Sequence, residues 1–548
     1  MKLRIFPYCI IAALAFIVYL PTFTGDFIID DQSLVKNNPY IRELHPLASY
    51  LAQEDGIVDP ADREFHHTGY YRPLINLTYW FDYKIWKLNP TGFRLTNLLL
   101  HLLTCLLLYE LIMLLVGHRA GAFWGALFFT LHPVQTEAVA MIVSRNNLLA
   151  TLFLLTSLYA YIVWWKERSA PAFGISLLAF TGALFSKELG LCALPVFFLY
   201  QRFLAEEKAL RREVLSYLPY LIILACYLLL RKSAIDSTLI LPGDFWARVG
   251  FIPYLLLYNL KLLFLPYNLH SFTVLYPSSL LAPPSVLAMF ITAALAGAAY
   301  IMRTKRLLLF CLLSTFVALL PVLNLISILS VSLIAMRWLY LPAAFIAIGI
   351  AWGFSNWASN NKRLSLLVGS ALAIYFGGFT YLLNLTLWYD DQTLLRQEVL
   401  HFNNQRYAGG YAEMLLQQKQ YPEAERFFLR SLDNYPSKAA NYINYAALLV
   451  ETERPAMALQ MLDKAKALTM FGKEKFEWYI NMGAALAAQG QWNEALPFFQ
   501  WALARESDNP LVHNNLGVLL LKLNRQREAA AHFKILEALN KRNAGNRK

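Results

Sequence analysis

The chain has little cysteine and little charge for its length. Only 5 of its 548 residues are Cys, no two of them form a CxxC pair, and all lie in apolar stretches. This distribution argues against a disulfide framework and against a zinc site, because both need grouped cysteines. Charged residues make up 15% of the chain, and no basic run with interleaved aromatic residues occurs outside the apolar stretches. We therefore expect no nucleic-acid partner.

Apolar side chains, in contrast, are abundant. Hydrophobic residues make up 57% of the chain and aromatic residues 15%, and the mean hydropathy is +0.41. This composition is too apolar for a soluble protein of this size and predicts a polytopic membrane protein with a soluble part. The net charge of +12 has two interpretations. It reflects either basic cytoplasmic loops or attraction to anionic lipid and lipid phosphate.

Loop charges predict the topology. The first apolar segment runs from about Ile5 to Phe23 and follows Lys2 and Arg4. It lacks a small-residue cleavage site, so we expect a retained helix with a cytoplasmic amino end. The charges of the later loops favour about eleven spans, with the carboxyl-terminal part outside. A membrane domain is predicted over residues 1–388, with residues 25–93 as its first outer loop.

Beyond about Tyr389 the chain is less apolar, and small residues recur at regular intervals. Ala424, Ala458, Ala495 and Ala529 lie 34, 37 and 34 residues apart. Each is followed four residues later by a large apolar residue and preceded by a small one at twelve residues, which lets two helices cross closely. The spacing predicts about four tetratricopeptide repeats over residues 405–540, after a linker at 389–404 and before a basic tail at 541–548. The predicted fold class is all-α, a helical membrane domain followed by an α-solenoid.

Polar side chains concentrate in segments that this topology places at the outer membrane face. The pair Asp30 and Asp31 follows the first span directly. Ionisable groups at membrane depth are usually paired or functional, so these segments either neutralise one another or form one site. In such a site, cations hold the phosphate of a lipid-linked sugar and a carboxylate removes the proton of an acceptor hydroxyl. The candidates for contact with the donor phosphate or sugar are His66, His67, Tyr71, Arg72, His132, Glu137, Arg145, Lys187, Glu188 and Arg337.

The histidines leave several interpretations open. His66 and His67 bind a metal together with the aspartates, contact sugar or phosphate, or have a structural role. Adjacent histidines do not share a helix face, and the chain has no HExxH motif, so we expect neither a metal nor another cofactor. His132 and Glu137 either pair with each other at the membrane edge or orient the donor phosphate.

Several of these segments resemble the transmembrane and tetratricopeptide-repeat containing (TMTC) family of O-mannosyltransferases. The order is also similar, with the membrane half first and the repeats last. The His-Pro-x-x-Thr-Glu-Ala-Val motif combined with carboxyl-terminal repeats is the most specific part of the resemblance. The segments that resemble the family are Phe27–Asn38, Tyr71–Leu74, His132–Val139, Arg145–Leu149, Ser186–Glu188 and Met336–Pro342.

The resemblance implies a GT-C type fold and an inverting transfer of mannose from a polyprenyl- or dolichyl-phosphate sugar to protein Ser or Thr. By this analogy Asp30 is the base, with Asp31 second, and the cations Arg72, Arg145, Lys187 and Arg337 bind the phosphate. The repeats then bind the acceptor protein or a partner enzyme. Only about four repeats are present, and Ser144 precedes Arg145 where the family usually has Gly. The short array and compact loops suggest a bacterial homologue in the inner membrane, with its site and repeats in the periplasm (the ER lumen if eukaryotic).

We therefore expect a membrane glycosyltransferase with a polyprenyl-phosphate sugar, an acceptor protein and membrane lipid as partners. One alternative keeps the donor and changes the acceptor to a lipid or a glycan. Another is a non-catalytic membrane scaffold that displays the repeats. A transporter is disfavoured, because its polar residues would lie in the middle of the spans.

Overall fold

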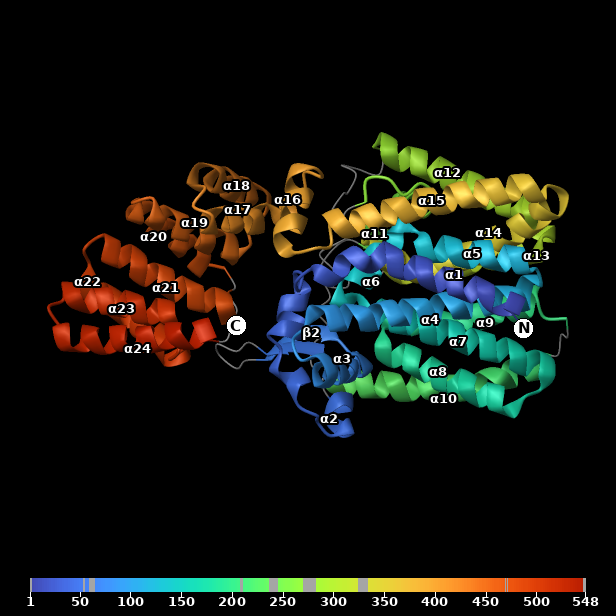
Figure 1. Cartoon of the computed structure of the whole chain (residues 1–548), viewed down its shortest axis with the longest axis horizontal. Coiled ribbons are helices and arrows are strands. Elements are labelled where there is room, and N and C mark those ends of the chain that lie inside the picture. The colour runs from blue at the N-terminus through green and yellow to red at the C-terminus, as the bar shows by residue number, and fades with distance from the viewer. Residues whose placement is uncertain are drawn as a thin grey trace. The chain divides into compact units, whose positions relative to one another are not determined.

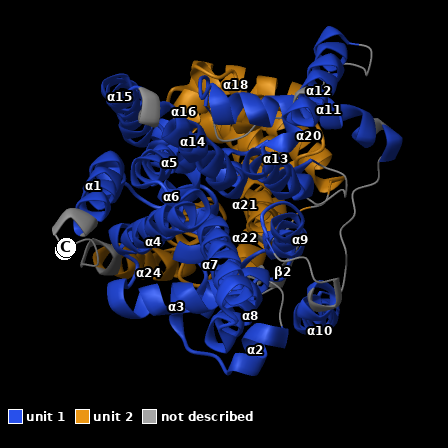
Figure 2. Ribbon diagram, turned by 90° about the vertical axis from the view of Figure 1, so that its right-hand side faces the viewer, with its two compact units in different colours: residues 1–57, 67–394 blue, residues 58–66, 395–548 orange. Residues whose placement is uncertain are grey.

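The computed structural model describes residues 2–52, 55–58, 65–206, 210–235, 245–269, 282–323, 334–468, 470 and 472–545. The chain divides into two compact units, which Figure 2 shows in different colours. Unit 1 comprises Met1–Ile57 and His67–Leu394, and unit 2 comprises Val58–His66 and Leu395–Lys548.

Unit 1 is built mainly from long helices that run alongside one another (Figure 1). Helix α7 packs on α8, and α5 packs between α4 and α14. The described strands form one two-stranded sheet of β1 (Asp55–Val58) and β2 (Phe65–Tyr70). The helices are α1 (Lys2–Tyr19), α2 (Leu47–Ala52), α3 (Pro73–Trp86), α4 (Pro90–Val116), α5 (Arg119–Leu131), α6 (Thr136–Ala140), α7 (Arg145–Glu167), α8 (Ala170–Ser186), α9 (Ala193–Phe203), α10 (Leu210–Ala234), α11 (Phe245–Phe264), α12 (Pro283–Ile301), α13 (Arg306–Leu319), α14 (Tyr340–Asn360), α15 (Lys362–Thr386) and α16 (Asp391–Leu400).

Seven helical segments of the described chain are long and apolar enough to cross a membrane. Two shorter apolar segments, Ala170–Ser186 and Arg306–Val322, accompany them. The all-helical class with membrane helices is thus confirmed, while the total of about eleven spans stays a prediction. The seven segments are Ile5–Thr24, Pro90–Val116, Ile142–Glu167, Glu213–Ala234, Pro283–Thr304, Met336–Trp357 and Lys362–Thr386.

The turns at the two ends of these helices differ in character. At one end the connections are short and basic, and Gly117 and Arg168 close α4 and α7 in the left-handed conformation. At the other end lie the irregular segments after α1, α5, α8 and α15, together with the 3₁₀ turn Met336–Leu339 before α14. Because neighbouring helices run antiparallel, segments that lie far apart in the sequence come together at this second end (Figure 1).

Unit 2 consists mainly of helix pairs with the recurrent packing that the sequence predicts. Gly483 and Phe499 show why a small residue recurs opposite a large apolar one. A Cβ on Gly483 would lie 2.9 Å from the Phe499 ring, too close for ordinary packing. The alanines Ala424 and Ala495 are fully buried where the paired helices meet. The pairs are α17 (Ala408–Gln417) with α18 (Tyr421–Asn434), α19 (Ala439–Glu451) with α20 (Pro455–Lys466), α21 (Gly472–Ala488) with α22 (Trp492–Arg505), and α23 (Pro510–Lys522) with α24 (Gln526–Gly545).

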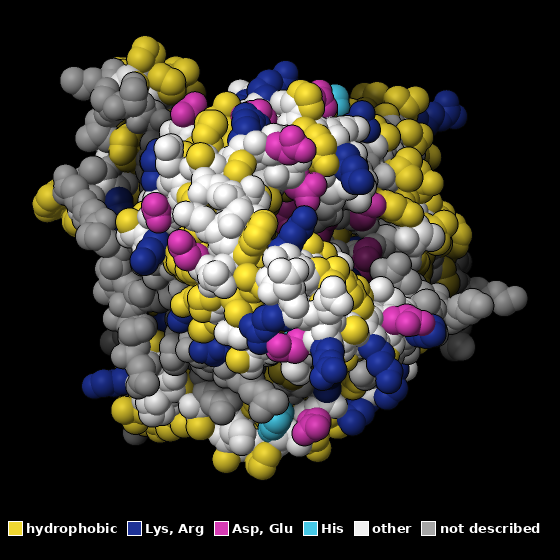
Figure 3. Space-filling view, turned by 90° about the vertical axis from the view of Figure 1, so that its left-hand side faces the viewer, with side chains coloured by type: hydrophobic (Ala, Val, Ile, Leu, Met, Phe, Trp, Pro, Cys, Tyr) yellow, Lys and Arg dark blue, Asp and Glu magenta, His cyan; other side chains and the backbone are white. Residues whose placement is uncertain are grey.

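The surface of the repeats carries charged side chains of both signs. Figure 3 shows Lys and Arg side chains interspersed with Asp and Glu on the face viewed there. Exposed ion pairs on the repeat helices include Lys473–Glu477 and Arg525–Glu528. Mixed surface charge of this kind is typical of a domain in water. In the sequence, α16 lies within the segment predicted as a linker, and it crosses the boundary of the two units at Leu394 and Leu395.

Candidate functional site

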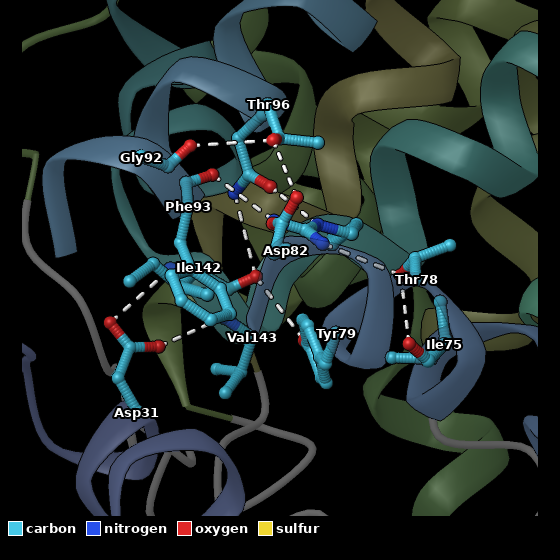
Figure 4. Close-up of polar contacts among 12 residues, drawn as sticks. Asp31, Ile75, Thr78, Tyr79, Asp82, Gly92, Phe93, Thr96, Ile142 and Val143 are labelled. Carbon is cyan, nitrogen blue, oxygen red and sulfur yellow. Dashed lines mark hydrogen bonds and ion pairs between the residues drawn. The ribbon is translucent and has the colours of Figure 1, made fainter. Parts of the chain in front are cut away.

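Asp31 is a buried anchor of the first outer loop. Its Oδ1 accepts a hydrogen bond from the Val143 amide at 2.8 Å, and its Oδ2 accepts from the amides of Ile142 and Ile28, each at 3.3 Å. Figure 4 shows the carboxylate pointing at the backbone of Ile142 and Val143. Burial raises the pKa of Asp31 to about 7, although these amides and Arg94 oppose the rise. Both carboxylate oxygens are therefore occupied in tying the loop to the start of α7.

Asp30 has a different environment from its neighbour. Its side chain is half-buried, and its backbone carbonyl accepts the Ser33 hydroxyl. Within the described residues its carboxylate accepts no hydrogen bond, whereas Asp31 accepts three. A base needs a free carboxylate oxygen that can reach the acceptor hydroxyl. The geometry therefore favours Asp30 over Asp31 as a candidate base. The sequence alone offers no physical ground for choosing between the two aspartates.

Glu137 and Arg337 form a buried ion pair. The backbone N–H of Arg337 donates to Glu137 Oε2 at 2.9 Å, and Arg337 Nη1 lies 3.5 Å from Oε1. Burial raises the pKa of Glu137, Arg337 and Lys187 lower it, and the charge of Asp30 raises it further. Asp30 lies within electrostatic range of this ion pair, and we group the three residues as one polar cluster.

Lys187, Arg72 and Glu188 extend the cluster from the other side. Lys187 Nζ donates to Asn147 Oδ1 at 2.6 Å, and Arg72 Nη2 lies 3.5 Å from Glu188 Oε2. Burial lowers the pKa of Lys187 to about 7, and the positive charges of Arg72 and Arg337 act in the same direction. Burial alone would raise the pKa of Glu188, but Arg72 and other nearby donors and cations lower it overall. Both the neutral and the charged form of Lys187 are therefore populated near neutral pH.

Arg231, at the end of α10, is a member of the cluster that the sequence reasoning missed. Its charge lowers the pKa of Glu188, and its Nε is buried with no hydrogen-bond partner among the described residues. The sequence signal for Arg231 was its position at the end of an apolar span. A charged side chain there costs free energy unless it is paired or binds a ligand.

The charges of the cluster do not balance among the residues that the structure describes. There the cluster has four cations, Arg72, Lys187, Arg231 and Arg337, and three carboxylates, those of Asp30, Glu137 and Glu188. Four minus three leaves one positive charge when every group is ionised. A phosphodiester carries one negative charge, so a bound phosphodiester would neutralise the site.

Arg145 lies outside this cluster and is fully buried. It pairs with Asp82, and its Nε and Nη2 donate to Asn97 Oδ1 at 2.8 Å and to the Phe93 carbonyl at 3.1 Å. Figure 4 shows Asp82 beside Thr96, whose hydroxyl donates to the other oxygen of Asp82 at 2.7 Å. With its donors used inside the protein, Arg145 ties α7 to α3 and α4, and we do not propose it as a phosphate ligand.

Tyr71 and His132 also have structural partners. The Tyr71 hydroxyl donates to the Leu51 carbonyl at 2.8 Å. His132 Nδ1 accepts from the Val134 amide at 3.2 Å, and its Nε2 donates to the Leu263 carbonyl at 2.9 Å. His132 therefore caps the turn before α6 and does not pair with Glu137. The side chains of His66 and His67 lie outside the described residues.

No group of three or more His, Cys, Asp or Glu in the described part of the chain is arranged to hold a metal ion. The arrangement can instead bind an anion through arginine and lysine. It also places one accessible carboxylate, Asp30, in the same cluster.

Fold and site together define an integral membrane protein with a charged site at one end of its membrane helices and a helical repeat domain. Residues 67–232 match the family model described as dolichyl-phosphate-mannose-protein mannosyltransferase, and residues 480–544 match that of the tetratricopeptide repeat.

Three curated relatives are named protein O-mannosyl-transferases. The chain is 26% identical to F38B6.6 of Caenorhabditis elegans, over 65% of this chain and 52% of the relative. It is 24% identical to human TMTC3, over 94% of this chain and 62% of the relative. It is 33% identical to human TMTC2, over 35% of this chain and 23% of the relative. The resemblance to the TMTC proteins is confirmed, while the chain spans only part of the length of these relatives.

Proposed function

We propose that the chain transfers a monosaccharide, mannose in the first instance, from a polyprenyl-phosphate donor to Ser or Thr hydroxyls of a protein acceptor. The observation on which this proposal rests is the polar cluster in which Arg337 pairs with Glu137, Arg72 lies 3.5 Å from Glu188 and Lys187 donates to Asn147. Asp30 and Arg231 lie within electrostatic range of these carboxylates. The names of the relatives and the matched family model supply the sugar and the acceptor class.

The proposed reaction is a single displacement with inversion. The acceptor oxygen forms a bond to the anomeric carbon, and its proton passes to Asp30. The bond between the anomeric carbon and the phosphate oxygen breaks, and the electron pair leaves with the phosphate. Lys187, Arg337 and Arg72 stabilise the charge that develops on that phosphate.

The site is proposed to face the outer side of the membrane. The opposite ends of the helices carry the basic turns that include Arg119, Lys166, Arg303 and Lys362, and such turns favour the cytoplasm. The outer side is the periplasm if the protein is bacterial and the ER lumen if it is eukaryotic. We propose that the repeats recruit the acceptor protein, because helical repeat arrays present extended binding surfaces.

The test is a transfer assay with the purified chain in lipid, polyprenyl-phosphate mannose, and separate pools of peptides, lipids and glycans. Mass spectrometry then identifies which pool gains a hexose. Modified Ser or Thr in peptides is the expected result, whereas modified lipid or glycan would support the alternative acceptor. Donor binding without transfer to any pool would contradict the proposed reaction, and absence of both binding and transfer would favour a scaffold.

Donor binding is expected to weaken as the pH rises through 7. The pKa of Lys187 is lowered to about 7, so the cation that attracts phosphate is present below this pH and lost above it. If only the charged form binds, the affinity should fall about tenfold between about pH 6 and pH 8. Isothermal titration with polyprenyl-phosphate mannose, a phosphodiester whose own charge is the same at both pH values, measures the change. Lys187→Arg, which stays charged, should flatten the profile, and an unchanged profile in this variant would exclude Lys187 as the titrating group.

A further inference from the structure

The backbone just before Asp30 adopts an unfavourable conformation. Ile29 has a φ of 45°, in the left-handed region where a β-branched side chain is strained. The turn is closed by hydrogen bonds from the Asp31 amide to the Ile28 carbonyl at 2.9 Å and from the Gln32 amide to the Ile29 carbonyl at 3.0 Å. Such strain persists only where surrounding contacts impose it, and it is concentrated at functional sites.

The contact that holds this turn comes from the far end of unit 1. The Ile29 amide donates to Asp391 Oδ1 at 2.6 Å, across 362 positions of the chain. Gln32, on the other side of Asp30, is held within the same loop, because its Nε2 donates to the Phe27 carbonyl at 2.9 Å. The Asp391 carboxylate therefore holds the backbone of the residue that directly precedes Asp30.

The surrounding backbone fixes Asp391 against this turn. The Asp26 amide donates to the Tyr389 carbonyl at 3.1 Å. Gly25 allows this approach, since a Cβ there would lie 2.1 Å from the Tyr389 oxygen. Arg94 donates to the carbonyls of Thr22, at 2.7 Å, and Asp26. The segment after α15 and the segment after α1 are thus joined by the Asp26–Tyr389 and Ile29–Asp391 hydrogen bonds, next to Asp30 in the sequence.

We propose that Asp391 is a positioning residue that imposes the left-handed turn at Ile29 and so aims the carboxylate of Asp30 at the reacting hydroxyl. Asp391 acts through the backbone and does not itself contact substrate. The inference rests on the proposed function for its effect on catalysis, but the imposed turn is a property of the fold alone. Asp391 lies outside the segment matched by the mannosyltransferase family model, so that match does not point to it.

Asp391→Ala removes the acceptor of the Ile29 amide, and the neighbouring Asp390 supplies a matched control. Asp390 Oδ1 accepts the Thr393 amide at 2.7 Å and so caps α16. Asp390→Ala therefore loosens the same segment without touching Ile29. Asp391→Asn retains an oxygen that can accept the Ile29 amide. Ile29→Gly, combined with Asp391→Ala, removes the cost of a positive φ.

The first readout is hydrogen exchange of a peptide that covers residues 27–33, measured on the full chain in lipid. We expect faster exchange in Asp391→Ala and parent-like exchange in Asp390→Ala and Asp391→Asn. The second readout is sugar transfer. We expect kcat to fall in Asp391→Ala on the order of 10²-fold, because a small displacement of a reacting group has an effect of this size. The donor KM should stay unchanged, Asp391→Asn should keep most of the activity, and the double variant should regain part of it.

Parent-like exchange in Asp391→Ala would overturn the proposal, whether or not the chain transfers sugar. Altered exchange with undiminished kcat would also overturn it, since Asp391 would then be structural only. If the parent transfers no sugar at all, the proposed function fails, while the exchange data still decide whether Asp391 imposes the turn.

Discussion

Asp30→Asn is expected to lower the rate of sugar transfer by about 10²- to 10⁴-fold, the usual contribution of a general base. The amide is similar in shape but cannot take the acceptor proton. Polyprenyl-phosphate binding should remain, because the cations that attract the phosphate are unchanged. Transfer measured by mass spectrometry and binding measured by calorimetry on the same preparation separate the two effects.

Asp31→Asn provides the contrast. An amide has only one acceptor oxygen, so its NH₂ group would face the backbone N–H groups that Asp31 now satisfies. Each N–H left unpaired costs about 1–3 kcal/mol, so the free energy of unfolding should fall, and transfer per folded molecule should fall less than in Asp30→Asn. An inactive, fully stable Asp31→Asn beside an active Asp30→Asn would reverse the assignment.

Asp82→Ala is expected to reduce the free energy of unfolding by about 3–5 kcal/mol, because it leaves Arg145 buried without its carboxylate. Removing both charges with Asp82→Ala and Arg145→Met should restore much of the loss. Denaturant unfolding in detergent, followed by tryptophan fluorescence, measures the difference.

Lys36→Ala is the control for this measurement. It removes an exposed ion pair of the same unit, in which Lys36 lies 3.9 Å from Asp26, and such pairs contribute little. An Asp82→Ala variant that unfolds like Lys36→Ala would contradict the structural role of the Asp82–Arg145 pair.

The sequence could predict part of the cluster, but not Arg231 and not the partners of each residue. Arg72, Glu137, Lys187 and Arg337 were identifiable because ionisable groups at one membrane face are usually functional or paired. Arg145 has the same sequence signature, yet it binds Asp82 inside the protein. Which carboxylate meets which cation depends on how the helices pack, and the spacing of residues does not encode this.

Asp31 and Asp391 illustrate the same limit. Adjacent aspartates look equivalent in sequence, but only the fold brings the amides of Ile142 and Val143 to Asp31. Asp391 meets Ile29 through a contact between distant parts of the chain, and no local pattern predicts it. The repeats, by contrast, were predictable because each pair of helices packs through local, recurring small and aromatic residues such as Gly517 and Phe533.

The decisive measurement is an experimental structure of the chain in lipid with bound polyprenyl phosphate. We expect phosphate density in contact with Lys187, Arg337, Arg72 and Arg231, with the Asp30 carboxylate on the side where an acceptor hydroxyl would approach. Phosphate bound elsewhere in the membrane unit, with the cations of this cluster paired only with its own carboxylates, would contradict the proposed donor site.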